Sequence, residues 1–270
     1  MAIGAHVKLC FLAAALAGVA AAGEPAAPGV QACGVRVVAP GPEEEMRAFN
    51  WTPGVTVALL VNVPGGGVID VEDDVSKLTV FRDDKGKDLL KSGGGEGVFE
   101  RAGFGMMPQI SKDGRLVLLE AQAPGCPTKG AAALRLSGEA VLRVASKTEE
   151  FAAQNVALKP NTPIQAGPIP FTVFSVGKPD FGGEEYQLQV GLQARKEVSS
   201  VADIRFFDAA GKKLEVQRSM TSSTGDGVNA TVQWLYLLKD KPDAVKVVIT
   251  YWTDMRQVRI PFDLSVGLGL

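Results

Sequence analysis

Four acidic side chains stand close together in the segment DVEDD, residues 70–74. They are Asp70, Glu72, Asp73 and Asp74. Calcium in proteins takes about six to eight oxygen ligands, which the loops of β-rich domains supply from clusters of this kind. The spacing fits no defined calcium loop, and a solvated acidic loop is the more common origin of such a run. The segment is therefore a candidate calcium site, with a solvated loop as the alternative.

The distribution of histidine limits the catalytic chemistry. The single histidine, His6, lies in the N-terminal segment that is expected to be removed. Its absence from the mature chain excludes Ser-His-Asp and Cys-His nucleophile systems and zinc sites with a histidine ligand. Glycoside hydrolysis needs only two carboxylates about 5–10 Å apart and stays open. Adjacent acids such as Glu149 and Glu150 suit it poorly, because neighbours in a strand point to opposite faces. We predict no catalytic residue and no cofactor.

Four aromatic side chains are candidates for a ligand-binding face. Trp234 and Tyr236 alternate in TVQWLYLL and so share one face of a predicted strand. Trp252 follows on a strand that is expected to be a neighbour, and Trp51 stands beside a turn in FNWTPG. A β-sandwich core needs large aromatic residues, so burial in the core is the favoured interpretation of Trp234. Exposure of Trp51 or Trp252 would instead favour a sugar-binding face.

Cysteine usage predicts a disulfide. Cys10 lies in the expected signal segment, which leaves Cys33 and Cys126 as the only pair in the mature chain. Two remaining cysteines in an exported protein are more often bridged than catalytic. A bridge across a loop of this length would contribute about 4–5 kcal/mol to stability if it formed without strain. Two free thiols are the alternative.

The first 22 residues are typical of a secretory signal peptide. Lys8 is followed by an apolar run of 14 residues, and Ala20 and Ala22 form a small-residue cleavage step before Gly23. The run is shorter than the roughly 20 residues of a membrane span, and no later stretch is longer. We therefore predict a soluble, exported protein in the periplasm, at the cell surface or outside the cell. Residues 23–32 are expected to be a flexible segment.

The charge balance bears on the class of partner. The chain carries 28 basic and 30 acidic side chains, a formal net charge of −2. Nucleic-acid and anionic-membrane partners usually require a clustered basic surface. The composition therefore predicts neither a nucleic-acid partner nor a membrane partner.

The mature sequence predicts strands almost throughout. Short segments rich in Val, Ile, Leu, Phe and Tyr recur along it, separated by Gly, Pro, Asp and Ser. The segment 147–158 is the best helical candidate, although its end resembles a strand. The fold class is therefore all-β. The predicted strands cover residues 35–39, 55–63, 77–81, 115–121, 132–136, 140–146, 171–176, 186–192, 203–207, 230–238, 245–252 and 258–264.

An internal repeat indicates two domains. FRDDKGKDL (81–89) and FFDAAGKKL (206–214) are identical at five of nine positions, and the shared D-x-x-G-K predicts the same hairpin turn in each. Further on, 140–158 aligns with 247–266 as a strand, a charged turn and a closing strand. We predict domain 1 over 33–160, a Pro-rich linker over 161–170 and domain 2 over 171–270.

These F-x-D-x-x-G-K-x-L hairpins and paired closing strands resemble the tandem immunoglobulin-like or fibronectin-type β-sandwich modules of exported bacterial proteins. The resemblance implies two tandem sandwiches that act in interaction or structure, not in catalysis. Sheet edges and loop tips would then contact another exported or cell-surface protein, or a polysaccharide. The alternative function is a carbohydrate-binding module or a carboxylate-dependent glycosidase.

Overall fold

The computed structural model describes residues 28–41, 52–91, 103–105, 108–179, 183–225 and 230–269. Every regular element in these ranges is a β-strand, and the strands pair into four antiparallel sheets. The predicted all-β class is confirmed. Over the same ranges no helix has the length and apolar character needed to cross a membrane. The predicted signal peptide lies outside the described residues.

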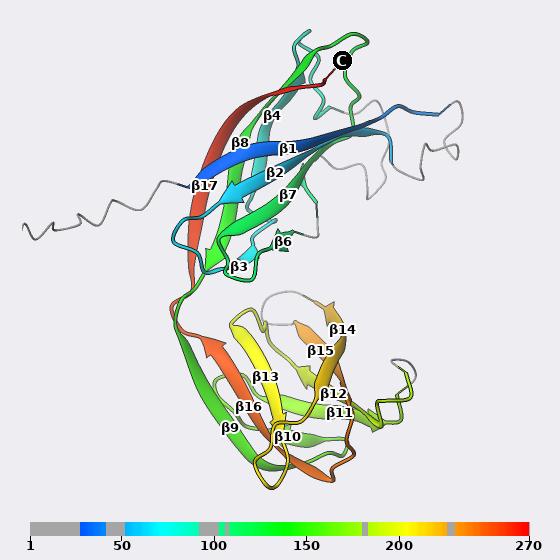
Figure 1. Ribbon diagram of the computed structural model, residues 1–270, viewed down its shortest axis with the longest axis vertical. Coiled ribbons are helices and arrows are strands. Elements are labelled where there is room, and N and C mark those ends of the chain that lie inside the picture. The colour runs from blue at the N-terminus through cyan, green and yellow to red at the C-terminus, as the bar shows by residue number, and fades with distance from the viewer. Residues whose placement is uncertain are drawn as a thin grey trace, which may run out of the picture.

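Two of the sheets enclose one apolar core and form the first sandwich (Figure 1). One sheet has the order β1-β2-β7-β5, with β6 also on β7, and the other has the order β17-β8-β3, with β4 also on β8. Phe81, Leu136 and Phe262 are among the residues buried between them. The strands are β1 (Gly29–Val38), β2 (Gly54–Asn62), β3 (Val68–Val71), β4 (Lys77–Asp83), β5 (Gly103–Phe104), β6 (Gln109–Ile110), β7 (Leu116–Ala123), β8 (Ala133–Val144) and β17 (Arg256–Gly267).

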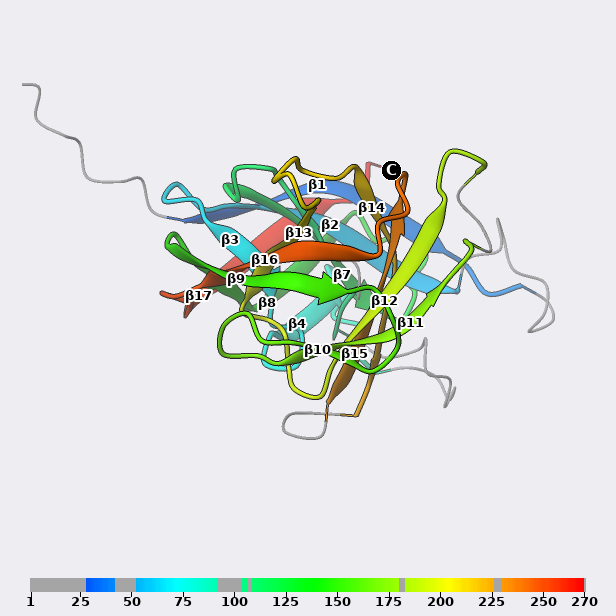
Figure 2. The ribbon, with the colours of Figure 1, turned by 90° about the horizontal axis from the view of Figure 1, so that it is seen from below.

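The other two sheets form the second sandwich around a separate core. One sheet has the order β10-β11-β12-β15-β14 and the other β13-β16-β9. Figure 2, which looks from below, shows β9 and β16 of the smaller sheet side by side. Phe171, Phe206 and Trp234 lie in this core. The strands are β9 (Thr148–Ala157), β10 (Thr162–Ile164), β11 (Phe171–Gly177), β12 (Leu188–Ala194), β13 (Val201–Phe207), β14 (Val216–Thr224), β15 (Thr231–Leu238) and β16 (Ala244–Trp252).

The two copies of the repeated motif form the same turn. In the first copy, Asp83 Oδ1 accepts the backbone N–H groups two and four residues later, at 3.1 and 2.8 Å. In the second, Asp208 Oδ1 accepts the equivalent pair, both at 2.9 Å. Gly86 and Gly211 have φ values of 88° and 83°, where a β-carbon would be strained. The predicted turn is confirmed, and the flanking apolar residues are buried in both copies: Phe81, Leu89, Phe206 and Leu214.

The two sandwiches exchange their closing strands. β17, near the C-terminus, pairs with β8 of the first sandwich along its whole length. β9, which follows β8 in the sequence, pairs with β16 of the second sandwich. The orders β4-β8-β17 and β13-β16-β9 are therefore equivalent, as are β1-β2-β7-β5 and β11-β12-β15-β14. This pairing departs from the predicted domains 33–160 and 171–270, because each sandwich takes its closing strand from the other side of that boundary.

The two connections between the sandwiches are held to each other by the carboxylate of Asp254 and by a backbone hydrogen bond from Thr253 to Lys147. They cover residues 145–147 and 253–255. Asp254 accepts the backbone N–H groups of Ser146 and Lys147, both at 2.9 Å, and the Ser146 hydroxyl at 2.6 Å. These hydrogen bonds lower the pKa of Asp254 to about 2. The carboxylate therefore bonds one connection to the other and is ionised at neutral pH.

The predicted linker over 161–170 is part of the second sandwich. β10 begins within it and pairs with β11. Ile164, Ala166 and Ile169 are buried in the second core, and the Tyr251 hydroxyl donates to the Ala166 carbonyl at 2.8 Å. The alternation of apolar residues with proline lets this segment cover the core while offering few N–H donors. Similarly, β1 begins at Gly29, inside the segment 23–32 that was expected to be flexible.

Candidate functional site

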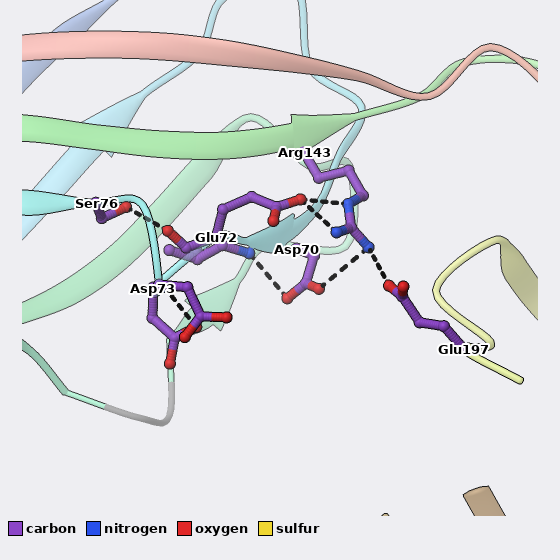
Figure 3. Close-up of polar contacts among 8 residues, drawn as sticks. Asp70, Glu72, Asp73, Ser76, Arg143 and Glu197 are labelled. Atoms are coloured by element: carbon purple, nitrogen blue, oxygen red, sulfur yellow. Dashed lines mark hydrogen bonds and ion pairs between the residues drawn. The ribbon is translucent and has the colours of Figure 1, made fainter. Parts of the chain in front are cut away.

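The acidic segment DVEDD begins in β3 and continues into the turn before β4 (Figure 3). Asp70 lies opposite Arg143 of β8 in the strand pairing, and its Oδ2 atom is 3.9 Å from Arg143 Nη1. The Nε and Nη2 groups of Arg143 both contact Oε1 of Glu72. The Arg143 and Glu72 side chains are only 18% and 16% exposed. The most buried acid of the segment is thus neutralised by an arginine.

The remaining acids of the segment make local contacts. Asp73 Oδ1 accepts the backbone N–H of Asp74 at 3.0 Å, and the Ser76 hydroxyl donates to the Glu72 carbonyl at 2.7 Å. In the described part of the chain, no three Asp, Glu, His or Cys side chains lie close enough together to hold a metal ion. The structure therefore does not bring the four predicted acids together as a calcium site. Their positions fit a solvated loop anchored by Arg143.

Arg143 also reaches the second sandwich. Its Nη1 atom is 3.7 Å from Oε1 of Glu197, which lies in the segment between β12 and β13 (Figure 3). Glu197 is 60% exposed, so this contact contributes little energy by itself. The acidic segment thus takes part in a contact between the two sandwiches.

The predicted disulfide between Cys33 and Cys126 is not formed, and both cysteines are free. Cys33 occupies a bulge in the middle of β1, whereas the Sγ of Cys126 lies 3.2 Å from the carbonyl oxygen of Val38, the last residue of that strand. Five residues of extended strand span about 16 Å. A disulfide joins Cα atoms that are roughly 4.4–6.8 Å apart. The two thiols therefore lie along the same strand, but Cys33 is at its middle and Cys126 is beside its last residue.

We expect both thiols to react with a maleimide in native, unreduced protein. Cys33 is exposed and Cys126 is half-buried, so Cys33 should react first. Mass spectrometry of the labelled chain, with Cys33→Ser and Cys126→Ser as single-site controls, measures the two rates separately. Labelling that requires both denaturant and reductant would contradict the free-thiol geometry.

Trp234 and Tyr236 share one face of β15 as predicted, but that face lies in the second core and is not an exposed ligand-binding face. Trp234 is buried and stacks on Phe171, with ring centroids 5.6 Å apart, and Tyr236 packs edge-on against Phe206. Trp252 is half-buried. Trp51 lies outside the described residues. Trp234 therefore belongs to the core, and Tyr236 lines a cavity.

That cavity is a groove of about 610 Å³ in the second sandwich. It lies where the chain crosses from β13, at the edge of one sheet, to β14, at the edge of the other. The apolar part of its lining comes from core positions, which include Phe206, Leu214 and Tyr236. Its charged lining comes from the two edge strands, from the segment that joins them and from the residue after β15: Asp203, Arg205, Lys213, Glu215, Arg218 and Lys239.

A pair of carboxylates holds one of the cations of the groove. Lys239 Nζ lies 2.8 Å from Oε2 of Glu215 and 3.1 Å from Oε2 of Glu185. The hydrogen bond and the charge of Lys239 lower the pKa of Glu215, and both carboxylates raise the pKa of Lys239. Glu215 and Lys239 are therefore ionised over the ordinary pH range and compensate each other.

Arg218 has a different environment. Its guanidinium carbon lies 5.8 Å from the centroid of the Trp234 ring, an arrangement that favours a cation over the ring face. Burial raises the pKa of Tyr236, and the nearby charge of Arg218 acts in the opposite direction. Among the described residues, neither Arg218 nor Lys213 forms an ion pair with a carboxylate. The groove therefore has two cations that its own acids do not compensate.

Sequence reasoning did not find this groove, apart from Tyr236. The strand β14 has the sequence VQRSMTSST, which is too polar to be predicted as a strand. One signal was present: at the end of the second repeat, the segment KLEVQ alternates polar and apolar residues from Lys213 to Gln217. No protein-family model, no curated protein and no solved structure matches the chain, so the function has to be argued from this geometry.

Proposed function

We propose that this chain is an exported, non-catalytic protein that binds another exported or cell-surface protein through two immunoglobulin-like sandwiches. The signal-like residues 1–22 support export. The strand orders support the immunoglobulin-like topology, in which four strands lie in the order A-B-E-D and three in the order C-F-G. β1-β2-β7-β5 with β4-β8-β17 has this arrangement, and so has the second sandwich.

The single observation that carries the proposal is the groove between β13 and β14. It combines core aromatic and aliphatic side chains with charged groups from two sheet edges, which is the composition of a protein-binding surface. Its carboxylates are already paired: Glu215 with Lys239, and Asp203 with Arg205 at 3.5 Å. A glycosidase needs one carboxyl whose pKa is raised so that it can donate a proton. The lowered pKa of Glu215 supports binding over hydrolysis.

The aromatic residues support a protein partner over a polysaccharide. A sugar-binding platform requires exposed rings that lie in one plane. Trp234 and Tyr236 are 6% and 5% exposed, and their rings already pack against Phe171 and Phe206. Among the described candidates only Trp252 retains part of its surface, which is too little for a platform.

Site-specific photo-crosslinking in the native host tests this function. A photoreactive amino acid replaces Lys213 at the groove in one variant, and Lys159, an exposed lysine of the same sandwich, in the control. We expect a discrete protein adduct from position 213 that is absent from position 159. Identical adducts at both positions, or none at position 213, would contradict the proposal. So would hydrolysis of a chromogenic glycoside that is lost in Asp203→Asn or Glu215→Gln.

A further inference from the structure

We propose that the groove binds an extended, acidic peptide segment, which adds a strand to the free edge of β13. This inference rests on the proposed function and specifies the partner's chemistry. It combines three features of the groove, which are an unpaired strand edge, an apolar lining and uncompensated positive charge.

The backbone of β13 offers hydrogen bonds toward the groove. Among the described strands β13 pairs with β16 alone, and its other edge carries one isolated bridge, between Phe207 and Lys213. The Phe206 carbonyl accepts the N–H of Leu214 at 2.9 Å, so the backbone groups of Phe206 point away from β16. The backbone N–H and C=O groups of successive residues in a strand point to alternate sides, so residues two apart point to the same side. The N–H and C=O of Ile204 therefore also point away from β16. Within the described chain these two groups have no hydrogen-bond partner.

The accessible edge is short. At one end the hydrogen bond from Leu214 to Phe206 already occupies the edge. At the other end a bulge between Val201 and Asp203 distorts the pairing with β16. Bulges of this kind limit unwanted pairing at sheet edges. What stays open, from Asp203 to Arg205, suits a peptide of about three to five residues, because an extended chain rises about 3.4 Å per residue.

The side chains around this edge specify what such a peptide carries. Alternate side chains of an added strand would face the narrow apolar floor of the groove, where Phe206, Leu214 and Tyr236 each expose only a small part of their surface, and the others would face the charged rim. On that rim, Lys239 is already paired with two carboxylates. Lys213 and Arg218 form no ion pair with any described carboxylate, and therefore the rim favours acidic side chains or a terminal carboxylate over basic ones.

The defined probe is a fluorescent peptide of alternating valine and glutamate, six residues long, with a free C-terminal carboxylate. One control peptide carries lysine for glutamate, and a second is N-methylated at alternate residues, which blocks strand pairing and leaves the charge unchanged. Fluorescence anisotropy on the full mature chain measures affinity, and amide NMR shifts show which residues respond. We expect shifts in 203–206 and 213–216, and an affinity at least about tenfold weaker for either control.

Charge-reversed variants test the rim. Lys213→Glu and Arg218→Glu should each weaken the acidic peptide about tenfold or more, whereas Lys159→Glu should leave the affinity unchanged. Thermal melting of each variant confirms that the fold is retained. N-acetylglutamate serves as a small carboxylate: shifts from it that match those of the peptide would overturn strand addition in favour of a small-anion site.

The two proposals fail in different ways. Equal affinity for the acidic, basic and N-methylated peptides, or no binding by any of them, would overturn the acidic-strand inference. In either case a crosslink at position 213 would still support a protein-binding function. If the peptide bound but no crosslink formed at position 213, the native partner would not bind at the groove. That result would overturn the proposed function and leave the peptide specificity of the groove intact.

Discussion

Removal of residues 255–270 is expected to unfold the first sandwich while the second stays folded. The deletion removes β17, which pairs with β8 along its whole length. Ile260 and Phe262 of β17 are buried in the first core, and each contributes about 1.5–3 kcal/mol by burial. Without β17 the central strand β8 becomes an edge and the core is opened. The loss is comparable with the about 5–15 kcal/mol that stabilises a whole domain.

Hydrogen–deuterium exchange measured by mass spectrometry separates the two sandwiches. Peptides from β2, β7 and β8 should lose protection, and peptides from β12, β15 and β16 should keep it. A control that lacks only residues 269–270 should behave as the intact chain. Addition of a synthetic peptide of residues 255–270 should restore protection in the first sandwich, because it supplies the missing strand. Full protection of β8 in the truncated chain would contradict the exchanged pairing.

The strands could be predicted because their signal is local. The alternation in VTVALLVNV places Val55, Val57, Leu59 and Val61 on one buried face, as found in β2. The Asp-x-x-Gly-Lys turns could be predicted for the same reason, since the carboxylate bonds backbone N–H groups within its own turn. By contrast, β9 was the best helical candidate, and its conformation depends on pairing with β16 about 90 residues away.

The exchange of closing strands could not be predicted because the repeat makes both positions equivalent. β9 and β17 each follow a buried strand after a three-residue connection, which is also a common hairpin length. Nothing local distinguishes pairing with the preceding strand from pairing with its counterpart in the other repeat. The contacts that make the difference, such as Asp254 with Ser146 and Lys147, join residues over 100 positions apart.

The candidate site was missed for a related reason. Its charged residues were each part of ordinary surface charge in the sequence, and only the approach of two sheet edges groups Lys213 and Arg218 with Arg205 of β13. In the sequence, a run of like residues such as the acidic segment 70–74 is easier to recognise as a candidate site. The acidic run at 70–74 is instead bound by Arg143. This contact depends on the position of Arg143 opposite Asp70 in the strand pair, which the sequence does not reveal.

The two repeat turns allow a matched test of how burial changes the effect of one hydrogen-bonding residue. Asp83→Ala is expected to lower the free energy of unfolding by about 3 kcal/mol, and Asp208→Ala by about 1 kcal/mol. Asp83 is 3% exposed, and besides its own turn it accepts the N–H of Thr128 at 2.7 Å. Its removal leaves three N–H groups without an acceptor. Asp208 is only half-buried, so water can replace the lost bonds in the second turn.

The ionisation of Asp83 adds a pH dependence to this test. Burial raises the pKa of Asp83, but the hydrogen bonds from Thr128, Lys87 and Lys85 outweigh it and lower the pKa to about 2. A carboxyl whose pKa is lower in the folded state than in the unfolded state stabilises the protein above its unfolded value, near 3.8. This contribution, at most about 2 kcal/mol, is lost as the pH falls from about 4 toward 2.

Urea denaturation between pH 7 and pH 2 measures the loss of stability and its pH dependence. The unfolding of the first sandwich is monitored by the hydrogen–deuterium exchange of peptides from β4 and β8. Wild-type stability should fall more steeply below pH 4 than that of Asp83→Ala, because the variant has already lost the titrating group. Asp83→Asn, which keeps one acceptor oxygen without the charge, should lie between the two at pH 7. Equal losses for Asp83→Ala and Asp208→Ala would mean that the bond to Thr128 contributes nothing. The shared turn alone would then determine the effect in both repeats.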